Sequence, residues 1–448
     1  MSATARLGWP VHAVASAVSG QLVGDGEATV GSVATDSRSD VRDAVFVAIR
    51  GERFDGHEFV VDAIAQGAAV VIVDRAYRGS AEPRIVVDDT VSALLDLAVK
   101  RRGELTVPVI AITGSTGKTS TKDLVAAAIP GSWSSPRSFN NEIGLPLTVV
   151  NTPHDSTAVV LEVGSRGSGH ISSLQAAIRP DVAVVTNLGV VHLETFGSED
   201  GLADAKYELI EALGPSGVAI VPDDEPRLQR GTAPHQLTFG EGRGDVSFAD
   251  LVVDALGHPT FTVSARATVQ RVSLEVAGAH QAHNAAAAVC VAVALGYDIE
   301  EFVEGLSKAS GSAWRMEVHE GRFTVVNDAY NANPQSVAAA LETLAAMRAG
   351  RRYAVLGPMA ELGPVCETAH RDMGELAVRL GIDGLIVVGV DHGYGIGAGS
   401  LVTNAMGIED AADTLRAVVE PGDVVLVKAS RSAGLERLAI ALVEESRP

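Results

Sequence analysis

A glycine-rich loop in the first half of the chain has the composition of a phosphate-binding site. In the segment Val109–Ser120, an apolar stretch leads into Gly114 and Gly117, and Lys118 and Thr119 follow directly. Glycines let backbone N–H groups curl around phosphate oxygens, and a helix beginning at the lysine adds partial positive charge. The residues predicted to hold a nucleoside triphosphate are Gly114, Ser115, Thr116, Gly117, Lys118, Thr119 and Ser120.

Each polar side chain of this loop has a chemical task that suits its position. Lys118 can reach the β- and γ-phosphates, and the Thr119 hydroxyl suits Mg²⁺. The strict pattern has glycine where this chain has Ile112, so the loop is a variant. A chance Gly-Lys-Thr in a surface turn is the structural alternative. The strand signal before the loop and the helix signal after it favour the nucleotide site.

Two further residues follow the ends of predicted strands. Glu162 lies near the end of the stretch Val159–Val163, and His192 comes shortly after Val182–Asn187. The carboxyl ends of parallel strands share one edge of a sheet, so both residues can meet the same nucleotide. Mg²⁺ prefers oxygen ligands, which makes Glu162 a natural ligand and His192 a less usual one. Lys206, on a predicted helix, has only the pattern of a solvated lysine.

The elements that must position these residues follow an alternating rhythm. From about Val107 onward, short β-branched strands alternate with helical stretches, which predicts a parallel sheet covered by helices. The same rhythm recurs near the end of the chain, and residues 248–276 predict an antiparallel sheet edge. The first hundred residues carry a strand and helix signal at Glu58–Asp74 but no phosphate loop. We therefore predict an α/β protein with boundaries near residues 105 and 318.

In the last third, the predicted elements are well separated by turn residues. Strands are expected at Phe323–Asn327, Tyr353–Leu356, Leu385–Val388 and Val424–Val427. Helices are expected at Pro334–Arg348, Glu367–Leu380, Ile408–Val419 and Gly434–Glu444.

Composition limits the possible partners and location. The chain has 448 residues, of which 46% are hydrophobic, and its formal net charge is −21. Such an acidic chain repels nucleic acids and anionic membranes, so neither is an expected partner. The longest apolar run, near Ala285–Leu295, is too short to span a bilayer, and a cytoplasmic protein is expected. The basic triplet Lys100–Arg102 is expected to be a solvated helix end.

Several segments beyond the phosphate loop complete a longer pattern. In chain order they are Thr113–Thr119, Asn140–Pro146, Glu162–Gly164, Asn187–His192, Ala205–Lys206, Gly278–His280 with Asn284, Trp314–Met316 and Asp328–Pro334. This order resembles that of the Mur ligases, and the resemblance runs from about Thr35 to Arg431, nearly the whole chain. It departs from the family at His170, where many members have glutamate, and at Pro358 and Ala429.

The resemblance implies a fold and an activity. The domains would be an N-terminal UDP-substrate domain over residues 1–105, a central ATPase domain over 106–318 and a C-terminal Rossmann-like domain over 319–448. The reaction would be an ADP-forming, ATP-dependent ligation through an acyl-phosphate, as in peptidoglycan precursor synthesis. The segment Asn327–Pro334, followed by Ser336, resembles members that join D-alanyl-D-alanine to UDP-N-acetylmuramoyl-tripeptide. A monomer is also implied, and both diaminopimelate and lysine stay open at the third peptide position.

The resemblance also implies roles for individual residues. Lys206 would be carbamoylated (N6-carboxylysine), and the matching magnesium-site residues would hold two Mg²⁺ ions; this set is Thr119, Glu162, His192 and the Lys206 carbamate. Residues matching adenine, γ-phosphate and ribose contacts are Asn284, Arg315 and Asp328, with Asn331 beside them. The implied catalytic residues are Lys118, Lys206, His192 and Arg315. The implied substrate-binding residues are Ser37, Arg38, Asn140, Asn141, Asn187, Ser430 and Arg431.

Other interpretations fit parts of the same pattern. Another amide ligase of this family, such as a folylpolyglutamate synthase, would share the ATP site. A non-catalytic nucleotide-binding regulator would need no second set of metal ligands beside Glu162. A P-loop kinase or GTPase is weakened by the C-terminal domain and by the lack of an Asn/Thr-Lys-x-Asp guanine-reading segment. His57 fits a UDP contact and a structural loop histidine equally well.

Overall fold

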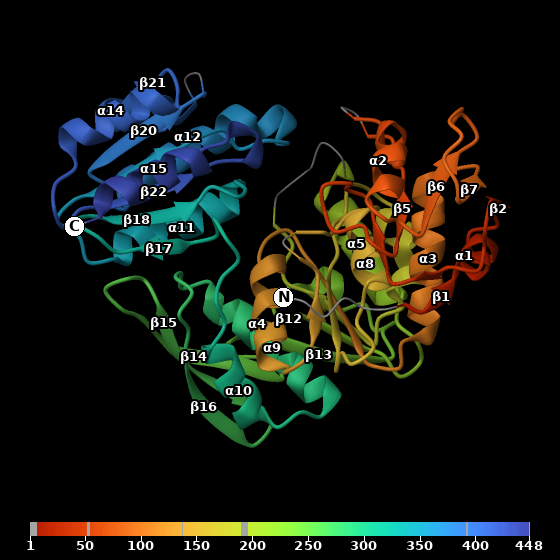
Figure 1. Cartoon of the computed structure of the whole chain (residues 1–448). Helices are drawn as coiled ribbons and strands as arrows, with labels where there is room; N and C mark the ends of the chain where they lie inside the picture. Colours follow the sequence, from red (N-terminus) through yellow and green to blue (C-terminus); the bar gives the residue numbers. More distant parts are fainter. Residues whose placement is uncertain (1–6, 52–53, 137, 190–195, 391–392, 448) are drawn as a thin grey trace.

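The chain folds into three α/β domains that follow one another along the sequence (Figure 1). The computed structural model describes residues 7–51, 54–136, 138–189, 196–390 and 393–447, and His192 lies outside these ranges. Within them, no helix combines the length and the apolar character needed to cross a membrane. The predicted three-domain α/β class is confirmed.

The central domain is built on a nine-stranded sheet with the order β16-β15-β14-β13-β12-β11-β8-β10-β9. The strands from β9 to β14 pair in parallel, and β14, β15 and β16 pair antiparallel, which confirms the expected antiparallel edge. Their bounds are β8 Val109–Thr113, β9 Trp133–Ser134, β10 Val159–Glu162, β11 Val182–Val185, β12 Val218–Pro222, β13 His235–Glu241, β14 Val246–Val253, β15 Pro259–Ala265 and β16 Thr268–Ser273.

Helices cover both faces of this sheet, and the alternation of side chains along β8 shows why. Ile110 and Ile112 join the core under one set of helices, while Val109 and Ala111 join the core on the opposite face. The first set is α4 (Lys118–Ala128), α9 (Gln281–Leu295) and α10 (Ile299–Ser307); the second is α5 (Gly144–Val150), α6 (His170–Ile178) and α8 (Glu199–Glu211). Strand β8 is buried along its whole length, which favours the apolar run Val109–Ile112 before Thr113.

The N-terminal domain has a five-stranded sheet with the order β2-β7-β6-β5-β4. Of these elements, the sequence indicated only β6 and the helix before it, because the other strands are three or four residues long. The bounds are β2 Gln21–Val23, β4 Ser32–Ala34, β5 Ala44–Val47, β6 Val70–Asp74, β7 Arg84–Val87, α1 Val11–Ala17, α2 Val60–Ala65 and α3 Thr90–Glu104; β1 Trp9–Pro10 pairs with β3 Thr29–Val30. Leu94 and Leu97 of α3 share a core with Val150 of α5, which packs this domain against the central one.

The C-terminal domain has a six-stranded sheet with the order β17-β18-β22-β19-β20-β21. The four expected strands and four expected helices are present within about two residues of the expected ends. The strands are β17 Glu317–His319, β18 Thr324–Asp328, β19 Arg352–Leu356, β20 Gly384–Val388, β21 Val402–Ala405 and β22 Val424–Lys428. The helices are α11 Pro334–Ala346, α12 Cys366–Arg379, α13 Gly393–Ala398, α14 Ile408–Val418 and α15 Glu436–Ser446. The sequence missed β21, an edge strand with two exposed residues among its four.

The expectation that Lys100–Arg102 is a solvated helix end is wrong for both arginines. Arg101 is 1% exposed and donates to the Thr152 carbonyl at 2.7 Å. Arg102 is 8% exposed and donates to the carbonyls of Ile178 at 3.0 Å and Arg179 at 2.6 Å. Helix α3 packs against α5 and α6, so these side chains satisfy backbone groups at the ends of those helices.

We expect Arg102→Met to destabilise the protein by about 3 kcal/mol, because two buried carbonyls would lose charged donors. The measurement is the thermal unfolding midpoint, with Lys100→Met as the matched control on the same turn. Lys100 is partly exposed, pairs with partly exposed Glu104 and lies 4.6 Å from the centre of the Trp9 ring, so its loss should cost about 1 kcal/mol. Equal shifts in the two variants would contradict a structural role for Arg102.

Candidate active site

The phosphate loop is clamped between the end of β11 and helix α9. Gly114 has φ +144° and Gly117 has φ +78°, which are conformations that side chains rarely adopt. A Cβ at Gly114 would lie 1.9 Å from Thr186 Oγ1, and one at Gly117 would lie 2.4 Å from Asn284 Oδ1. Asn187 Oδ1 accepts from the Thr116 N–H at 3.0 Å. Both glycines are therefore required by close packing as well as by backbone conformation.

Strand β11 was predicted to reach Asn187 but ends two residues earlier, at Val185. The two residues after it contact the phosphate loop. After Val185 the chain leaves the ladder, and the Thr186 hydroxyl donates to the Thr116 carbonyl at 2.5 Å. Asn187 Nδ2 donates to Thr116 Oγ1 at 2.7 Å. The two polar residues thus serve the phosphate loop instead of the sheet.

An oxygen-rich cluster lies beside Lys118, where a divalent cation is predicted. Thr119 Oγ1 donates to Glu162 Oε2 at 2.7 Å, and Asn140 Nδ2 donates to Glu162 Oε1 at 2.7 Å. Glu162 is only 1% exposed. One hydroxyl and one carboxylate fit Mg²⁺, which usually takes its other ligands from water and substrate phosphates. Among the described residues, no three His, Cys, Asp or Glu side chains gather as a metal site.

Two lysines, partly exposed Lys118 and buried Lys206, give the site its positive charge. Lys118 Nζ donates to the carbonyls of Gly114 at 2.7 Å and Ser115 at 3.2 Å, and burial lowers its pKa. Lys206, on α8, is 3% exposed; burial and then the charge of Lys118 lower its pKa to about 7. Lys206 is therefore not a solvated lysine, and its amine is largely uncharged above neutral pH.

Arg315 connects the central and C-terminal domains. Its Nη2 donates to Ser138 Oγ at 3.2 Å, and its guanidinium lies 4.2 Å from the centre of the Tyr330 ring. The neighbours Trp314 and Met316 have φ +61° and +50°, which is strained backbone for residues with side chains. Arg315 therefore lines the same cleft as the phosphate loop. Contacts with the surrounding protein must hold the strained backbone on either side of it.

All of the predicted nucleotide residues except Gly114 line one cleft of about 790 Å³ between the two domains. Thr116 Oγ1 and Gln335 Oε1 lie 3.2 Å apart across this cleft. A smaller cleft of about 310 Å³ adjoins it, and the two share Asn331, Asn333, Glu361 and Arg431. The arrangement suits a reaction in which a nucleotide and a second substrate meet.

The residues expected to contact adenine and ribose line the large cleft, and both also make hydrogen bonds within the protein. Asn284 Nδ2 donates to Gln281 Oε1 at 2.9 Å. Asp328 accepts from the Met316 N–H at 3.2 Å and pairs with the buried Lys428 ammonium. Lys428 also donates to the Asn331 carbonyl at 2.9 Å. Asp328 therefore anchors the linker between domains, and its ribose contact stays a prediction.

The smaller cleft contains the two C-terminal residues predicted to bind substrate. Ser430 is 3% exposed, accepts from the Ala360 N–H at 2.8 Å and donates to the Ala332 carbonyl at 3.3 Å. The Arg431 guanidinium lies 4.3 Å from the centre of the Trp314 ring. The other walls are Asn331–Asn333 and residues 360–362 of the loop from Met359 to Leu362.

That loop is held by a buried histidine that the sequence did not reveal. His370 Nε2 accepts from the Met359 N–H at 3.0 Å, so Nδ1 carries the proton and donates to the Cys366 carbonyl at 2.7 Å. Burial lowers the pKa of His370. Within the same loop, Glu361 has φ +63°. A lone histidine on a helix gives no sequence signal for such a contact.

Three predicted substrate residues lie outside the linings of these clefts. Ser37 and Arg38 belong to the N-terminal domain, and the Arg38 guanidinium pairs with Asp36 at 2.8 Å. Asn141 Oδ1 accepts from the N–H groups of Ile143 at 3.2 Å and Gly144 at 2.8 Å. Its side chain therefore satisfies backbone donors at the start of α5.

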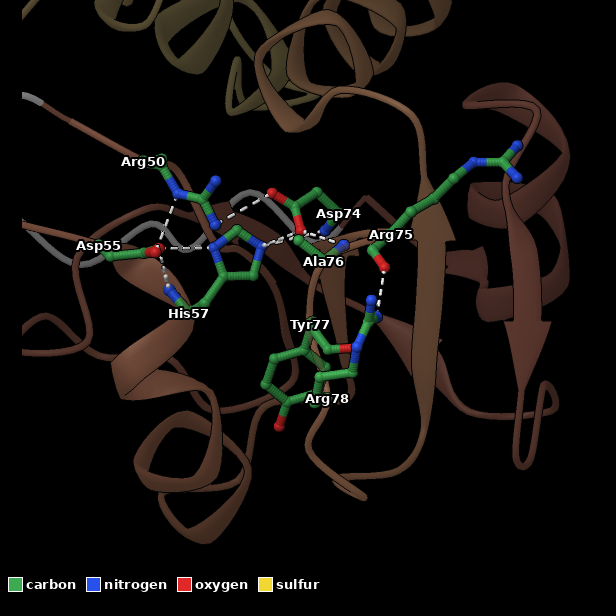
Figure 2. Close-up of polar contacts among 8 residues, drawn as sticks. All are labelled: Arg50, Asp55, His57, Asp74, Arg75, Ala76, Tyr77 and Arg78. Carbon is green, nitrogen blue, oxygen red and sulfur yellow. Dashed lines mark hydrogen bonds and ion pairs between the residues drawn. The ribbon is translucent and has the colours of Figure 1, made fainter.

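His57 is a structural histidine in this structure (Figure 2). Its Nε2 accepts from the Asp74 N–H at 3.0 Å, so Nδ1 carries the proton and donates to Asp55 at 2.6 Å. Arg50 completes the cluster through Asp55 at 2.9 Å and Asp74 at 3.3 Å. With both ring nitrogens used and 8% of the side chain exposed, His57 fixes its loop on β6.

Sequence reasoning missed several residues that complete the clefts. Ser138 lies within 3.4 Å of Thr119 Oγ1 and also accepts from Arg315. Gln335 and Lys428 reach the site from the opposite domain, and only Lys428 had a usable signal, because it ends a strand next to Ser430. Contacts between domains depend on their packing and leave no local pattern.

Three family models together match most of the chain. They are the Mur ligase family catalytic domain over residues 29–113, the Mur ligase middle domain over 112–292 and the Mur ligase glutamate ligase domain over 314–431. The UDP-N-acetylmuramoyl-tripeptide–D-alanyl-D-alanine ligase of Bacillus subtilis (strain 168) is 36% identical over 93% of this chain and 94% of its own length.

Solved structures show the same likeness in three dimensions. MurF from Acinetobacter baumannii superposes with a TM-score of 0.88 at 30% identity, covering 97% of this chain and 99% of that one. MurF ligase from Thermotoga maritima in complex with ADP gives a TM-score of 0.82 at 30% identity, covering 92% and 97%.

We expect His370→Gln to lower stability by about 1–2 kcal/mol at pH 7.5 and above, through loss of the Met359 contact. Because folding lowers the pKa of His370, its stabilising effect is present above the unfolded pKa near 6.5 and is lost as pH falls through the folded pKa. The difference in unfolding midpoint between the wild type and the variant should therefore shrink toward pH 5. Exposed His235, as His235→Gln, is the control, and a difference that grows with acidity would contradict this account.

Proposed function

Because the chain belongs to the Mur ligase family, we propose that it joins D-alanyl-D-alanine to the terminal carboxylate of UDP-N-acetylmuramoyl-tripeptide, using ATP. The observation that carries this proposal is the pair of adjoining clefts, one around a phosphate loop and one around Ser430 and Arg431. The product would be the pentapeptide precursor of peptidoglycan, with ADP and phosphate. We further propose that the enzyme works as a monomer in the cytoplasm, where ATP is available.

The first chemical step needs help because a carboxylate is a poor electrophile. The tripeptide carboxylate attacks the γ-phosphorus of ATP, ADP leaves, and an acyl-phosphate forms. Lys118 and Arg315 stand where they can spread the charge of the transferring phosphoryl group, and such electrostatic positioning dominates phosphoryl transfer. Ser138 and Tyr330 hold the Arg315 guanidinium in place.

Magnesium binding is the role we propose for Thr119, Glu162, His192 and carbamoylated Lys206. Bound Mg²⁺ would neutralise charge on the phosphate oxygens. Lys206 suits carbamoylation because only the uncharged amine attacks CO₂, and its lowered pKa leaves it uncharged above pH 7. The modification replaces an amine whose protonated form Lys118 repels with an anion that Lys118 attracts.

The second step takes place where the clefts meet. The amine of D-alanyl-D-alanine attacks the acyl carbon, the carbon–oxygen bond to phosphate breaks, and the amine loses its proton as the amide forms. Ser430 and Arg431 are proposed to hold the dipeptide. Water would destroy the acyl-phosphate, so the contact between Thr116 and Gln335, which brings the two domains together, also helps to exclude solvent.

The test is phosphate release from ATP with UDP-N-acetylmuramoyl-tripeptide, with and without D-alanyl-D-alanine. Release should require both substrates and give a pentapeptide by mass spectrometry. Lys118→Met should lower kcat about 10³-fold, because a charge made for the transition state is lost. Exposed Lys308, as Lys308→Met, is the control. Release without any dependence on the dipeptide would reject this activity.

We also expect activity at pH 8 to fall when CO₂ and bicarbonate are removed, and to return on adding bicarbonate. Lys206→Met should lose about 100-fold in activity and should not respond to bicarbonate. A wild-type enzyme indifferent to bicarbonate, with no 44-dalton adduct on the Lys206 peptide under native trapping, would contradict the carbamate. The adduct mass follows from the addition of one CO₂, roughly 44 daltons.

A further inference from the structure

A closed ring of polar contacts fixes Arg166 in the loop that follows β10. The Arg166 N–H donates to His170 Nδ1 at 3.1 Å, so the neutral ring carries its proton on Nε2. That Nε2 lies 3.4 Å from Glu142 Oε2, and Arg166 Nη1 donates to Glu142 Oε1 at 3.0 Å.

Helix α8 holds this ring of contacts in place through Glu208. Glu208 is 9% exposed, and its carboxylate accepts from the backbone N–H groups of Gly169 and Ser172. These donors belong to the first turn of α6, where His170 begins the helix. The contacts of Glu208 therefore hold the start of α6, including His170, in place. His170 in turn holds the Arg166 loop through its hydrogen bond with the Arg166 N–H.

Arg166 lines the large cleft, whereas Glu142, with 39% of its side chain exposed, is not among the lining residues. The side chain of Arg166 is 67% exposed. The Oε2 atom of Glu142 is buried against His170. A ligand in the cleft therefore meets a guanidinium whose position is already fixed, which favours a carboxylate that can accept two hydrogen bonds.

The place of Arg166 along the cleft indicates which part of a substrate it meets. Arg166 follows Glu162 by four residues, and Glu162 contacts Thr119 and Asn140 at the phosphoryl-transfer end. In the proposed reaction, the carboxylate activated at that end belongs to the third residue of the tripeptide. Because Arg166 lines the same cleft as Thr119, Asn140 and Glu162, a side chain carried by that third residue has Arg166 among the groups within its reach.

We propose that Arg166, positioned by Glu142 and His170, binds the distal carboxylate of a diaminopimelate third residue and so selects this tripeptide over one with lysine. The inference rests on the proposed function. Diaminopimelate ends in an amine and a carboxylate, whereas lysine ends in an amine alone, so the carboxylate is the feature that separates them. Both side chains carry the ammonium that Arg166 repels, but only in diaminopimelate does a neighbouring carboxylate offset this repulsion.

The experiment measures kcat/KM for both tripeptides with saturating ATP and D-alanyl-D-alanine. The wild type should favour the diaminopimelate substrate by roughly 10- to 100-fold, as expected for one charged hydrogen-bonded pair. Arg166→Met should remove most of that preference by raising KM for this substrate alone, with kcat and the KM for ATP nearly unchanged. Arg166→Lys should retain an intermediate preference, because the charge stays and the fork is lost.

Two controls separate recognition from general damage. Arg271→Met, on exposed edge strand β16, should leave both substrates unaffected. His170→Ala should lower the preference ratio less than Arg166→Met does, since it loosens the guanidinium without removing it. A purely structural role for His170 would lower activity on both tripeptides equally.

Three other outcomes would contradict the role proposed for Arg166. Equal losses on both tripeptides in Arg166→Met would overturn the inference, because Arg166 would then bind a group common to both. Equal use of both tripeptides by the wild type would overturn it while leaving the ligase function intact. If neither tripeptide gives dipeptide-dependent product, the proposed function fails, and this inference fails with it.

Discussion

The close packing of the phosphate loop is the constraint on which the rest of the site depends. Gly114 and Gly117 leave no space for a Cβ, because the end of β11 and helix α9 press on the loop from two sides. This packing fixes where α4 begins, and therefore where Lys118 and Thr119 point. Thr119 in turn holds Glu162 by a hydrogen bond, at the end of β10 where the next loop begins. If the phosphate loop could shift, Lys118, Thr119 and Glu162 would lose their alignment, because their positions depend on one another.

The candidate active site gathers positive charge although the protein as a whole is strongly acidic. The chain carries a net charge of −21, yet Lys118 and Lys206 lie close enough for one to lower the pKa of the other. Removing such cations from water is costly. The fold sustains this cost through its large apolar cores on both faces of the central sheet. An anionic nucleotide, and a carbamate in place of an amine, would both relieve the repulsion, so the site is electrostatically prepared for them.

Domain placement and chemistry are coupled through the linker between the central and C-terminal domains. Trp314 and Met316 hold left-handed backbone on either side of Arg315, and Asp328 fixes the second of them. Arg315 itself contacts Ser138 of the central domain. A rotation of the C-terminal domain would therefore move the guanidinium relative to the phosphates. The strain is consistent with an arginine that is in place only when the domains are in contact.

The sequence by itself determined the phosphate loop, the alternation of strands and helices and the three-domain α/β class, because these rest on local spacing and hydrophobic periodicity. It also indicated Glu162, since strand ends share one sheet edge. Only the tertiary structure showed that Arg102 is buried, that His57 fixes a loop and that the first domain contains a five-stranded sheet. It alone brought Gln335 to the phosphate loop. Contacts between distant segments depend on how domains pack, and that information is not carried by the pattern of any one segment.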